Sequence, residues 1–300
     1  MAGEASSAYN LEVLESVNES DVQNFIHLLE ALDGDDRYTP GVPSSLRRAV
    51  DSETTTVYVI RDSQDSSSVS TATLSRLPVI SERGRVFWID DVVTVPRALG
   101  HGFSKRTMDA MEDEASRCSE RVLLTSGYEL SSGTERTSAR AAYAKRGYEL
   151  FPNGLAVYRN NTLSAQRPEG TATLFDYNDS DVESIADLLH EKPINVETNL
   201  QAVLNTTHAA VLVRKRNHAV AAVAVANLTP IPTGFKPWID DAVAGNTPDL
   251  QAVIGAAEHW ISDRGGPYAN MVRATSEGLS EAYQQRSSGL FIKEFRRSYQ

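Results

Sequence analysis

The sequence predicts an α/β protein in which a mixed central sheet flanked by helices occurs twice in tandem. Two observations support this fold class. A chain of 300 residues with 41% hydrophobic residues is longer than a usual single domain and apolar enough to form two ordinary cores. Segments of the first half also recur in the same order in the second half, which indicates a diverged duplication.

The repeat is clearest in a helical segment. NESDVQNFIHLLEAL (18–32) recurs as NDSDVESIADLLHEK (178–192), with apolar residues at positions i, i+3, i+4 and i+7 in both copies. Further pairs follow in the same order: VYVIRDSQ with AVLVRKRN, FWIDDVV with PWIDDAV, and AAYAKRGYELF with EAYQQRSSGLF. The last pair aligns Tyr143 with Tyr283.

The polar stretch NNTLSAQRPEGT lies between the two copies and has the composition of a linker. We therefore expect a first domain at 1–160, a linker at 161–171 and a second domain at 172–300.

Periodicity within the first copy predicts the element order β-α-β-β-β-α-β-α-β. It begins with a strand in YNLEVLESV, a helix at 20–32 capped by Ser20 or Asp21, and a loop at 33–50 that ends in a short helix. TTTVYVIRD and SVSTATLSRLP alternate like the arms of a hairpin, and RVFWIDDVVTV is a third strand of the same sheet. A helix at 102–117, a buried strand in ERVLLTSG, a helix in SARAAYAKRG and a final strand in LAVYRN complete the copy.

Composition excludes several classes of function. A formal net charge of -11 argues against general nucleic-acid binding and against a peripheral membrane protein, since both need a basic face. The single cysteine, Cys118, allows neither an intramolecular disulfide nor a cysteine metal cluster, and the six histidines show no metal-ligand spacing. The chain has no leader-like N-terminal segment and no run of about 18 apolar residues. We expect a cytoplasmic protein without a bound metal, and a homodimer is compatible with the sequence.

The junction VVTVPRALGHGFSKRTMDAMEDEA (92–115) carries the strongest functional signal. β-Branched residues run into Pro96, and two glycines two positions apart then precede an amphipathic helix. A strand that enters such a turn gathers unpaired backbone N–H groups at the positive end of the helix dipole. Gly100 and Gly102 allow close approach of a ligand because neither carries a Cβ. The junction therefore predicts an anion site.

This junction and the segments after it resemble the GNAT superfamily of acyl-CoA-dependent N-acyltransferases. The phosphate turn of that family reads Arg or Gln, two residues, Gly, one residue, and Gly or Ala, and Arg97, Gly100 and Gly102 have this spacing. Pro96 directly precedes Arg97, where the family usually has two more residues. The later family pattern Ala-x-x-x-Tyr-x-x-x-Gly-aromatic is matched at 139–148.

The resemblance covers residues 8–159, and the repeat extends the same fold to 172–299. It implies transfer of an acetyl group from acetyl-CoA to an amine by direct attack in a ternary complex. We expect the amine of a small molecule, because duplicated domains can enclose a compact cleft. Tyr143 resembles the tyrosine that protonates the departing thiolate, and the strand would hold the pantetheine arm through backbone N–H groups at Val93, Thr94 and Val95. The turn would bind the pyrophosphate through Arg97, Gly100, His101, Gly102 and Phe103.

Asp90 and Asp91 are candidates for the general base, because alternation along the strand sends one carboxylate to each face of the sheet. The second copy retains both residues as Asp240 and Asp241, which favours a structural hydrogen bond instead. Tyr143 has a structural alternative as well, as a core aromatic on its helix.

The second copy replaces the glycine turn by AGNTPDLQAV, which contains Pro248 and Asp249. An aspartate repels a pyrophosphate, so we expect a degenerate domain that has lost the cofactor; binding of another acyl-CoA by a different route is the alternative. Two alternatives also stay open for the whole chain. One is acetylation of a protein lysine or N-terminal amine, and the other is a non-catalytic acyl-CoA-binding or interaction protein.

Overall fold

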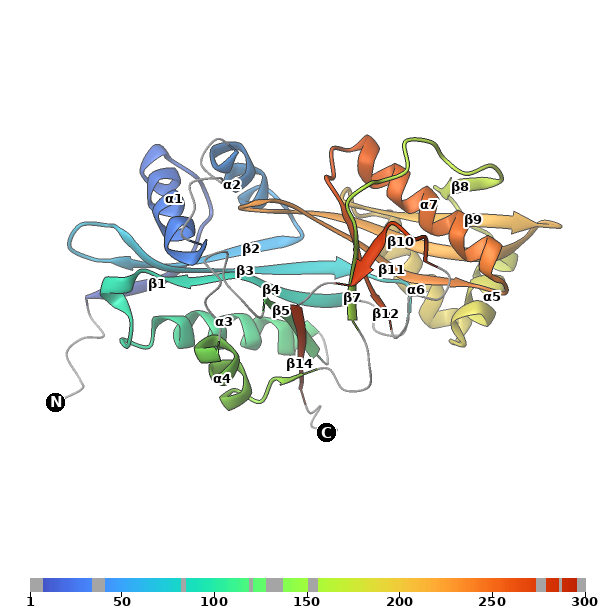
Figure 1. Ribbon diagram of the computed structural model, residues 1–300. Helices are drawn as coiled ribbons and strands as arrows, with labels where there is room; N and C mark the ends of the chain where they lie inside the picture. Colours follow the sequence, from blue (N-terminus) through green and yellow to red (C-terminus); the bar gives the residue numbers. More distant parts are fainter. Residues whose placement is uncertain are drawn as a thin grey trace.

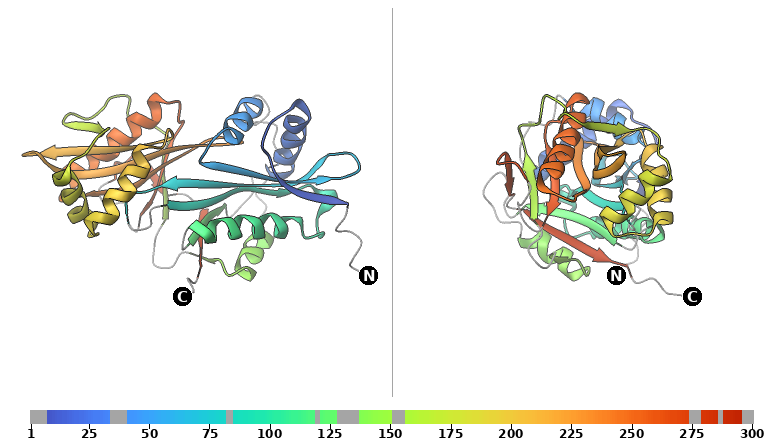
Figure 2. Two further views of the ribbon diagram at one scale, coloured as in Figure 1. Left: turned by 180° about the vertical axis from the view of Figure 1, so that it is seen from behind. Right: turned by 90° about the vertical axis from the view of Figure 1, so that its right-hand side faces the viewer.

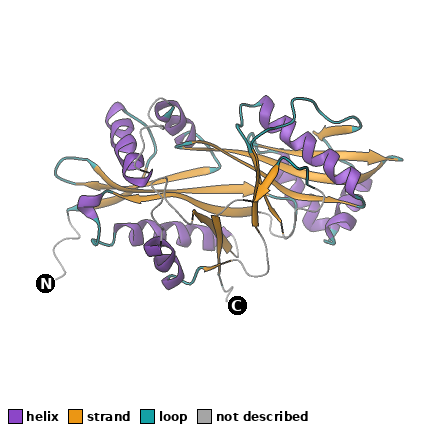
Figure 3. Ribbon diagram, in the orientation of Figure 1, coloured by secondary structure: helices purple, strands orange, loops and turns teal. Residues whose placement is uncertain are grey.

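The computed structural model describes residues 8–33, 41–81, 85–118, 121–127, 137–150, 156–273, 279–285 and 288–295. Two seven-stranded sheets lie end to end, and each has helices on both faces (Figure 1). The reverse view shows α1 and α2 on one face of the first sheet and α3 on the other (Figure 2). Strands run as an inner layer along the molecule with the helices outside (Figure 3).

The first half contains β1 (Tyr9–Val13), α1 (Glu19–Asp33), α2 (Val42–Val50), β2 (Thr55–Asp62), β3 (Ser68–Pro78), β4 (Arg85–Thr94), α3 (Phe103–Cys118), β5 (Arg121–Gly127), α4 (Thr137–Lys145) and β6 (Glu149–Leu150). A 3-10 turn at Pro96–Ala98 lies between β4 and α3. Within the described ranges, no helix combines the length and the apolar character needed to cross a membrane.

The second half contains β7 (Ala156–Asn160), β8 (Thr171–Leu174), α5 (Asp179–Leu189), α6 (Pro193–Leu204), β9 (Ala209–Arg216), β10 (Ala219–Ile231), β11 (Gly234–Ala244), α7 (Thr247–Asp263), β12 (Ala269–Arg273), β13 (Tyr283–Gln285) and β14 (Ser288–Glu294). From β8 to β12, its element order repeats that of the first half from β1 to β5. The predicted duplication is thus visible in the fold.

The two sheets exchange one strand each. Their orders are β1-β2-β3-β4-β5-β14-β6 and β8-β9-β10-β11-β12-β7-β13, so β7 and β14 occupy equivalent positions in each other's sheets. The strand in LAVYRN was expected to complete the first sheet, and that expectation is wrong, because β7 pairs with β12 and β13. Alternation of side chains is the same in either sheet, so sequence periodicity does not distinguish the two pairings. A cut at the predicted linker would remove one strand from each sheet.

Matching caps begin the first helix of each half. The Oδ1 atom of Asn18 accepts a hydrogen bond from the Asp21 N–H at 3.0 Å, and Asp21 accepts one from the Asn18 N–H at 2.9 Å. Asn178 and Asp181 form the same reciprocal box at α5. The expected cap at Ser20 or Asp21 is therefore corrected to Asn18, with Asp21 as its partner three residues later.

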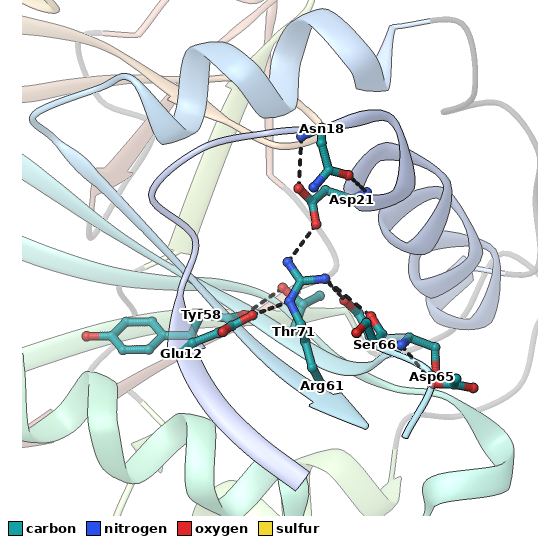
Figure 4. Close-up of polar contacts among 10 residues, drawn as sticks. Glu12, Asn18, Asp21, Tyr58, Arg61, Asp65, Ser66 and Thr71 are labelled. Atoms are coloured by element: carbon teal, nitrogen blue, oxygen red, sulfur yellow. Dashed lines mark hydrogen bonds and ion pairs between the residues drawn. The ribbon is translucent and has the colours of Figure 1, made fainter. Parts of the chain in front are cut away.

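Arg61 ties this cap to the sheet. Its guanidinium, on β2, donates to Asp21 at 2.6 Å and also binds Glu12 on β1 (Figure 4). Figure 4 shows Arg61 between these two carboxylates, under the start of α1. The arrangement fixes α1 on the first two strands of the sheet.

The two halves share a buried core. Trp88 on β4 stacks on Trp238 on β11 with ring centroids 4.3 Å apart. Around this pair the buried cluster includes Leu77 and Val86 from the first half and Val157 on the exchanged strand β7. Both halves are therefore packed against each other through their central strands.

Candidate functional site

The candidate site lies where β4 stops pairing with β5. The two strands pair in parallel only from Phe87 to Ile89 of β4. Beyond that point β4 contains a bulge, because the register against β3 shifts between Asp90 and Val93. Asp91, inside the bulge, has a left-handed φ of 50°. The bulge and the end of pairing with β5 leave one edge of β4 open.

The glycine turn follows this open edge. Gly100 and Gly102 have φ values of 82° and 77°, which L side chains rarely adopt. An added Cβ would meet no atom within 4 Å at either position. Glycine is therefore favoured here by the positive φ and not by lack of space. The first hydrogen bond of α3 runs from Arg106 N–H to the Gly102 carbonyl at 3.1 Å. The preceding N–H groups therefore lie at the positive end of α3, whose first turn contains no acidic residue.

A cavity of about 420 Å³ lies between α3, α4 and β4. Its lining is largely apolar, with basic groups at its margin, and consists of Val92, Ser104, Lys105, Met108, Ala139, Ala142, Tyr143, Lys145 and Arg146. Tyr143 lines the cavity from α4, where it is partly exposed. The cavity thus extends from the first turn of α3 to Tyr143, the predicted proton donor. It has room for an extended, mostly apolar ligand segment.

Ion pairs hold α4 against α3 beside the cavity. Arg146 binds Asp109 at 2.7 Å and Glu112 at 2.9 Å. Glu112 also binds Lys293, which the exchanged strand β14 supplies. Burial, together with the Glu112 carboxylate, raises the pKa of Tyr148, so this phenol stays protonated. Strand β14 therefore contributes a charge to the ion-pair group that holds Arg146 beside the cavity.

Val93, Thr94 and Val95, the strand residues predicted to hold the pantetheine arm, differ in the direction and the partner of their backbone N–H groups. The Val95 N–H donates to the Val69 carbonyl at 3.0 Å, so it is not available to hold a pantetheine arm. Successive N–H groups of a strand alternate in direction, so that of Thr94 faces the open edge and that of Val93 faces β3. The Thr94 hydroxyl also lies 2.8 Å from the hydroxyl of Ser104, which joins the strand to α3. Thr94 is the position that fits the predicted role.

The predicted residues of the turn are dispersed. Arg97 donates to the Ser67 hydroxyl at 2.9 Å, on the connection between β2 and β3. His101 is exposed and stacks on Phe103 with centroids 5.7 Å apart. The Phe103 ring is buried against Tyr9, so only its backbone lies in the turn. The backbone of the glycine turn, rather than these side chains, is the part placed for an anion.

The candidate bases lie at the boundary between the halves. Lys236 donates to both carboxylate oxygens of Asp90 at 2.6 Å. In the second half, Asp240 accepts from Asn227 at 3.1 Å. Asp241 accepts from the backbone N–H groups that follow β3, at 2.6 Å and 3.0 Å. These contacts agree with the structural alternative for the repeated acids. Sequence reasoning missed Lys236, because it lies 146 residues from its partner.

The second half closes the equivalent junction with its own side chains. Asn246 caps α7 by accepting from the Asp249 N–H at 3.0 Å. The buried Asp249 carboxylate binds Arg214 at 3.0 Å and Arg216 at 2.8 Å. Hydrogen bonding from Arg216 lowers the pKa of Asp249, although burial opposes the shift. An anion is thus already present at the start of α7.

The alignment of Tyr283 with Tyr143 is corrected by the structure. Tyr283 lies in strand β13, opposite Asn160, and burial beside Glu258 raises its pKa well above the usual value. Tyr148, one residue before β6, lies beside Glu112 in the same way. Because β6 and β13 occupy equivalent sheet positions, Tyr283 corresponds to Tyr148. The sequence alignment paired Tyr143 in helix α4 with Tyr283 in strand β13 because the residues around them are similar.

Comparison with known proteins places this geometry among known folds. No family model matches the chain, and no curated protein matches it. A tandem GNAT protein from the clavulanic acid biosynthesis pathway superposes with a TM-score of 0.55 at 12% identity, covering 97% of this chain and 99% of that one. The chain has the tandem GNAT fold.

Two further structures with this likeness come from other organisms. A putative acetyltransferase from Pyrococcus horikoshii gives a TM-score of 0.54 at 11% identity, covering 96% of this chain and 90% of that one. N-myristoyltransferase from Saccharomyces cerevisiae, solved with bound myristoyl-CoA and inhibitors, gives 0.52 at 10% identity, covering 97% and 81%. The glycine turn, the β4 bulge and the cavity beside α4 thus belong to a tandem GNAT fold.

Proposed function

We propose that the chain is an acetyl-CoA-dependent N-acetyltransferase with one active site, in the first half. The observation that carries this proposal is the cavity of about 420 Å³ that meets β4 at Val92, the first turn of α3 at Ser104, and Tyr143 on α4. The acceptor would be an amine of a small molecule. The likeness to GNAT proteins, including a putative acetyltransferase, supports an acyltransferase.

The donor would bind along the open edge of β4. Backbone N–H groups at the glycine turn and at the start of α3 would bind the pyrophosphate of acetyl-CoA. The pantetheine arm would follow β4, with the Thr94 N–H as a hydrogen-bond donor. Val92 and Met108 provide apolar contacts along this path.

The acceptor amine would attack the thioester carbon directly. A C–N bond forms, the C–S bond breaks, and coenzyme A leaves as a thiolate. Tyr143, which lines the cavity, would give its proton to that sulfur. The amine must lose one proton, and Asp91 stays a candidate to receive it, directly or through water. Asp90 is less suited as a base, because Lys236 occupies both of its oxygens.

Titration calorimetry with acetyl-CoA tests the donor site. We expect one site per chain, because Asn246 and Asp249 already satisfy the start of α7. Two equivalent sites would contradict the assignment of the second half as degenerate.

Thiol release from acetyl-CoA tests the reaction. Pools of polyamines, amino sugars, amino acids and lysine-containing peptides would serve as acceptors. Turnover with a small amine supports the proposal, and turnover confined to peptides would indicate a protein acetyltransferase. Tight binding of acetyl-CoA without turnover in any pool would instead indicate an acyl-CoA-binding protein.

A further inference from the structure

A buried ion pair joins the two halves next to the proposed active site. Lys236 on β11 and Asp90 on β4 have side chains only 6% and 15% exposed. The ammonium binds both carboxylate oxygens at 2.6 Å and lies 4.3 Å above the Trp88 ring. Trp238, stacked on Trp88, lies 5.6 Å from the ammonium. The lysine therefore contacts a carboxylate and lies against a pair of stacked aromatic rings.

The pair breaks the symmetry of the duplication. Trp88 and Trp238 are equivalent, so Lys236 takes the position of Val86, and Asp90 that of Asp240. Asp240 accepts a hydrogen bond from the neutral amide of Asn227. At the equivalent pair of positions, Val86 and Asp240, a valine replaces the lysine, so this ion pair is not repeated there.

The location of Asp90 gives the pair its effect. It is the last residue of β4 in regular register with β3 before the bulge, and it directly precedes Asp91 with its left-handed φ. It also directly follows Ile89, the last residue paired with β5. A side chain fixed here sets where β4 turns away from β5.

Burial lowers the pKa of Lys236, and the Asp90 carboxylate opposes this shift. Among the nearby charges, the Asp90 carboxylate does most to favour the charged form of Lys236. Loss of one partner would leave an uncompensated charge in the core beside the bulge. We expect β4 to move locally so that water can reach this charge.

We propose that Lys236, from the second half, is a positioning residue for the acyl-transfer site of the first half. It fixes Asp90 and hence the bulge of β4, so that the open edge at Thr94 has the geometry needed for the thioester. This role rests on the proposed function. It also gives the degenerate half a task in the reaction that does not need a cofactor of its own.

The test compares Lys236→Met, Lys236→Arg and the double variant Asp90→Asn with Lys236→Met in the full chain. Readouts are thermal melting, the Kd for acetyl-CoA, turnover in the thiol-release assay, and hydrogen exchange of amides 90–95. For Lys236→Met we expect turnover to fall by about 10²-fold, the scale on which small misplacements of reacting groups act. The Kd for acetyl-CoA should change little, exchange at 90–95 should accelerate, and Lys236→Arg should recover part of the turnover.

The double variant separates positioning from simple charge compensation. Because it removes both charges, it should recover the melting temperature without recovering turnover. Native turnover in the double variant, or in a folded Lys236→Met, would overturn the proposal. If the native chain acetylates no amine, the proposed function fails, and exchange still decides this point: unchanged amides at 90–95 in Lys236→Met overturn the positioning role, and faster exchange supports it.

Discussion

The starts of α3 and α7 occupy the same place in the two halves but present opposite chemistry. At α3, Gly100 and Gly102 shape a turn of exposed backbone, and the first helical turn contains no acid. At α7, Asn246 caps the helix, and Asp249 places a carboxylate there that Arg216 neutralises. One junction thus presents backbone N–H groups without an acidic side chain, whereas the other contains a carboxylate of its own. Equivalent places in the two halves therefore differ in charge although their fold is the same.

A second comparison shows what the duplication has retained. Glu112, Tyr148 and Lys293 cluster in the first sheet, and an equivalent group of Glu258, Tyr283 and Asn160 lies in the second. Each group is completed by the strand exchanged from the other half. Scaffold contacts are therefore preserved on both sides. The cavity described above depends instead on α4, which has no counterpart helix among the described residues of the second half.

The largest effect is expected for Tyr143→Phe. The ring that lines the cavity remains and only the proton donor is lost, so the fold and the Kd for acetyl-CoA should be preserved. General-acid assistance contributes a factor of about 10² to 10⁴ in rate, so turnover should fall by about that factor. This corresponds to a loss of roughly 3 to 5 kcal/mol of transition-state stabilisation. Steady-state kinetics would show the loss mainly in kcat.

Two matched controls sharpen this result. Tyr148→Phe and Tyr283→Phe remove equivalent buried hydroxyls that lie beside a helix glutamate in each half. Neither should reduce kcat as far as Tyr143→Phe does. A loss of turnover in Tyr283→Phe with a nearly native Tyr143→Phe would show that the active site lies in the second half and not in the first.

Gly102→Asp should have the next largest effect. It places a carboxylate beside the proposed pyrophosphate position, where it should weaken acetyl-CoA by at least ~2 kcal/mol, more than a tenfold rise in Kd. Because φ is 77° at this position, melting must show that the variant is folded. Gly245→Asp, at the junction before α7, is the control and should leave the Kd unchanged. An unaltered affinity in folded Gly102→Asp would mean that the phosphates bind elsewhere.

The sequence predicts the local elements of the site but not the contacts between the two halves. The glycine turn, the helix after it and the repeated WIDD strands follow from short-range periodicity, and the structure contains all three. The exchange of β7 and β14 depends on which of two equivalent gaps each strand enters, so local pattern carries no signal for it. Lys236 is equally hidden, because it reaches Asp90 only after the halves pack. A lysine in place of an apolar residue two positions before the repeated tryptophan was the available clue.

The smallest effect is expected for Asn246→Ala, which tests whether the cap alone closes the second junction. The variant loses the hydrogen bond from the Asp249 N–H, and removal of such a cap costs about 1 kcal/mol of unfolding free energy. Asn178→Ala at α5 removes an equivalent cap and should cost a similar amount in denaturant titration. Neither change should create a second acetyl-CoA site, because the Asp249 carboxylate, held by Arg214 and Arg216, still occupies the start of α7. A second site by calorimetry in Asn246→Ala would show that the cap, and not the aspartate, had excluded the cofactor.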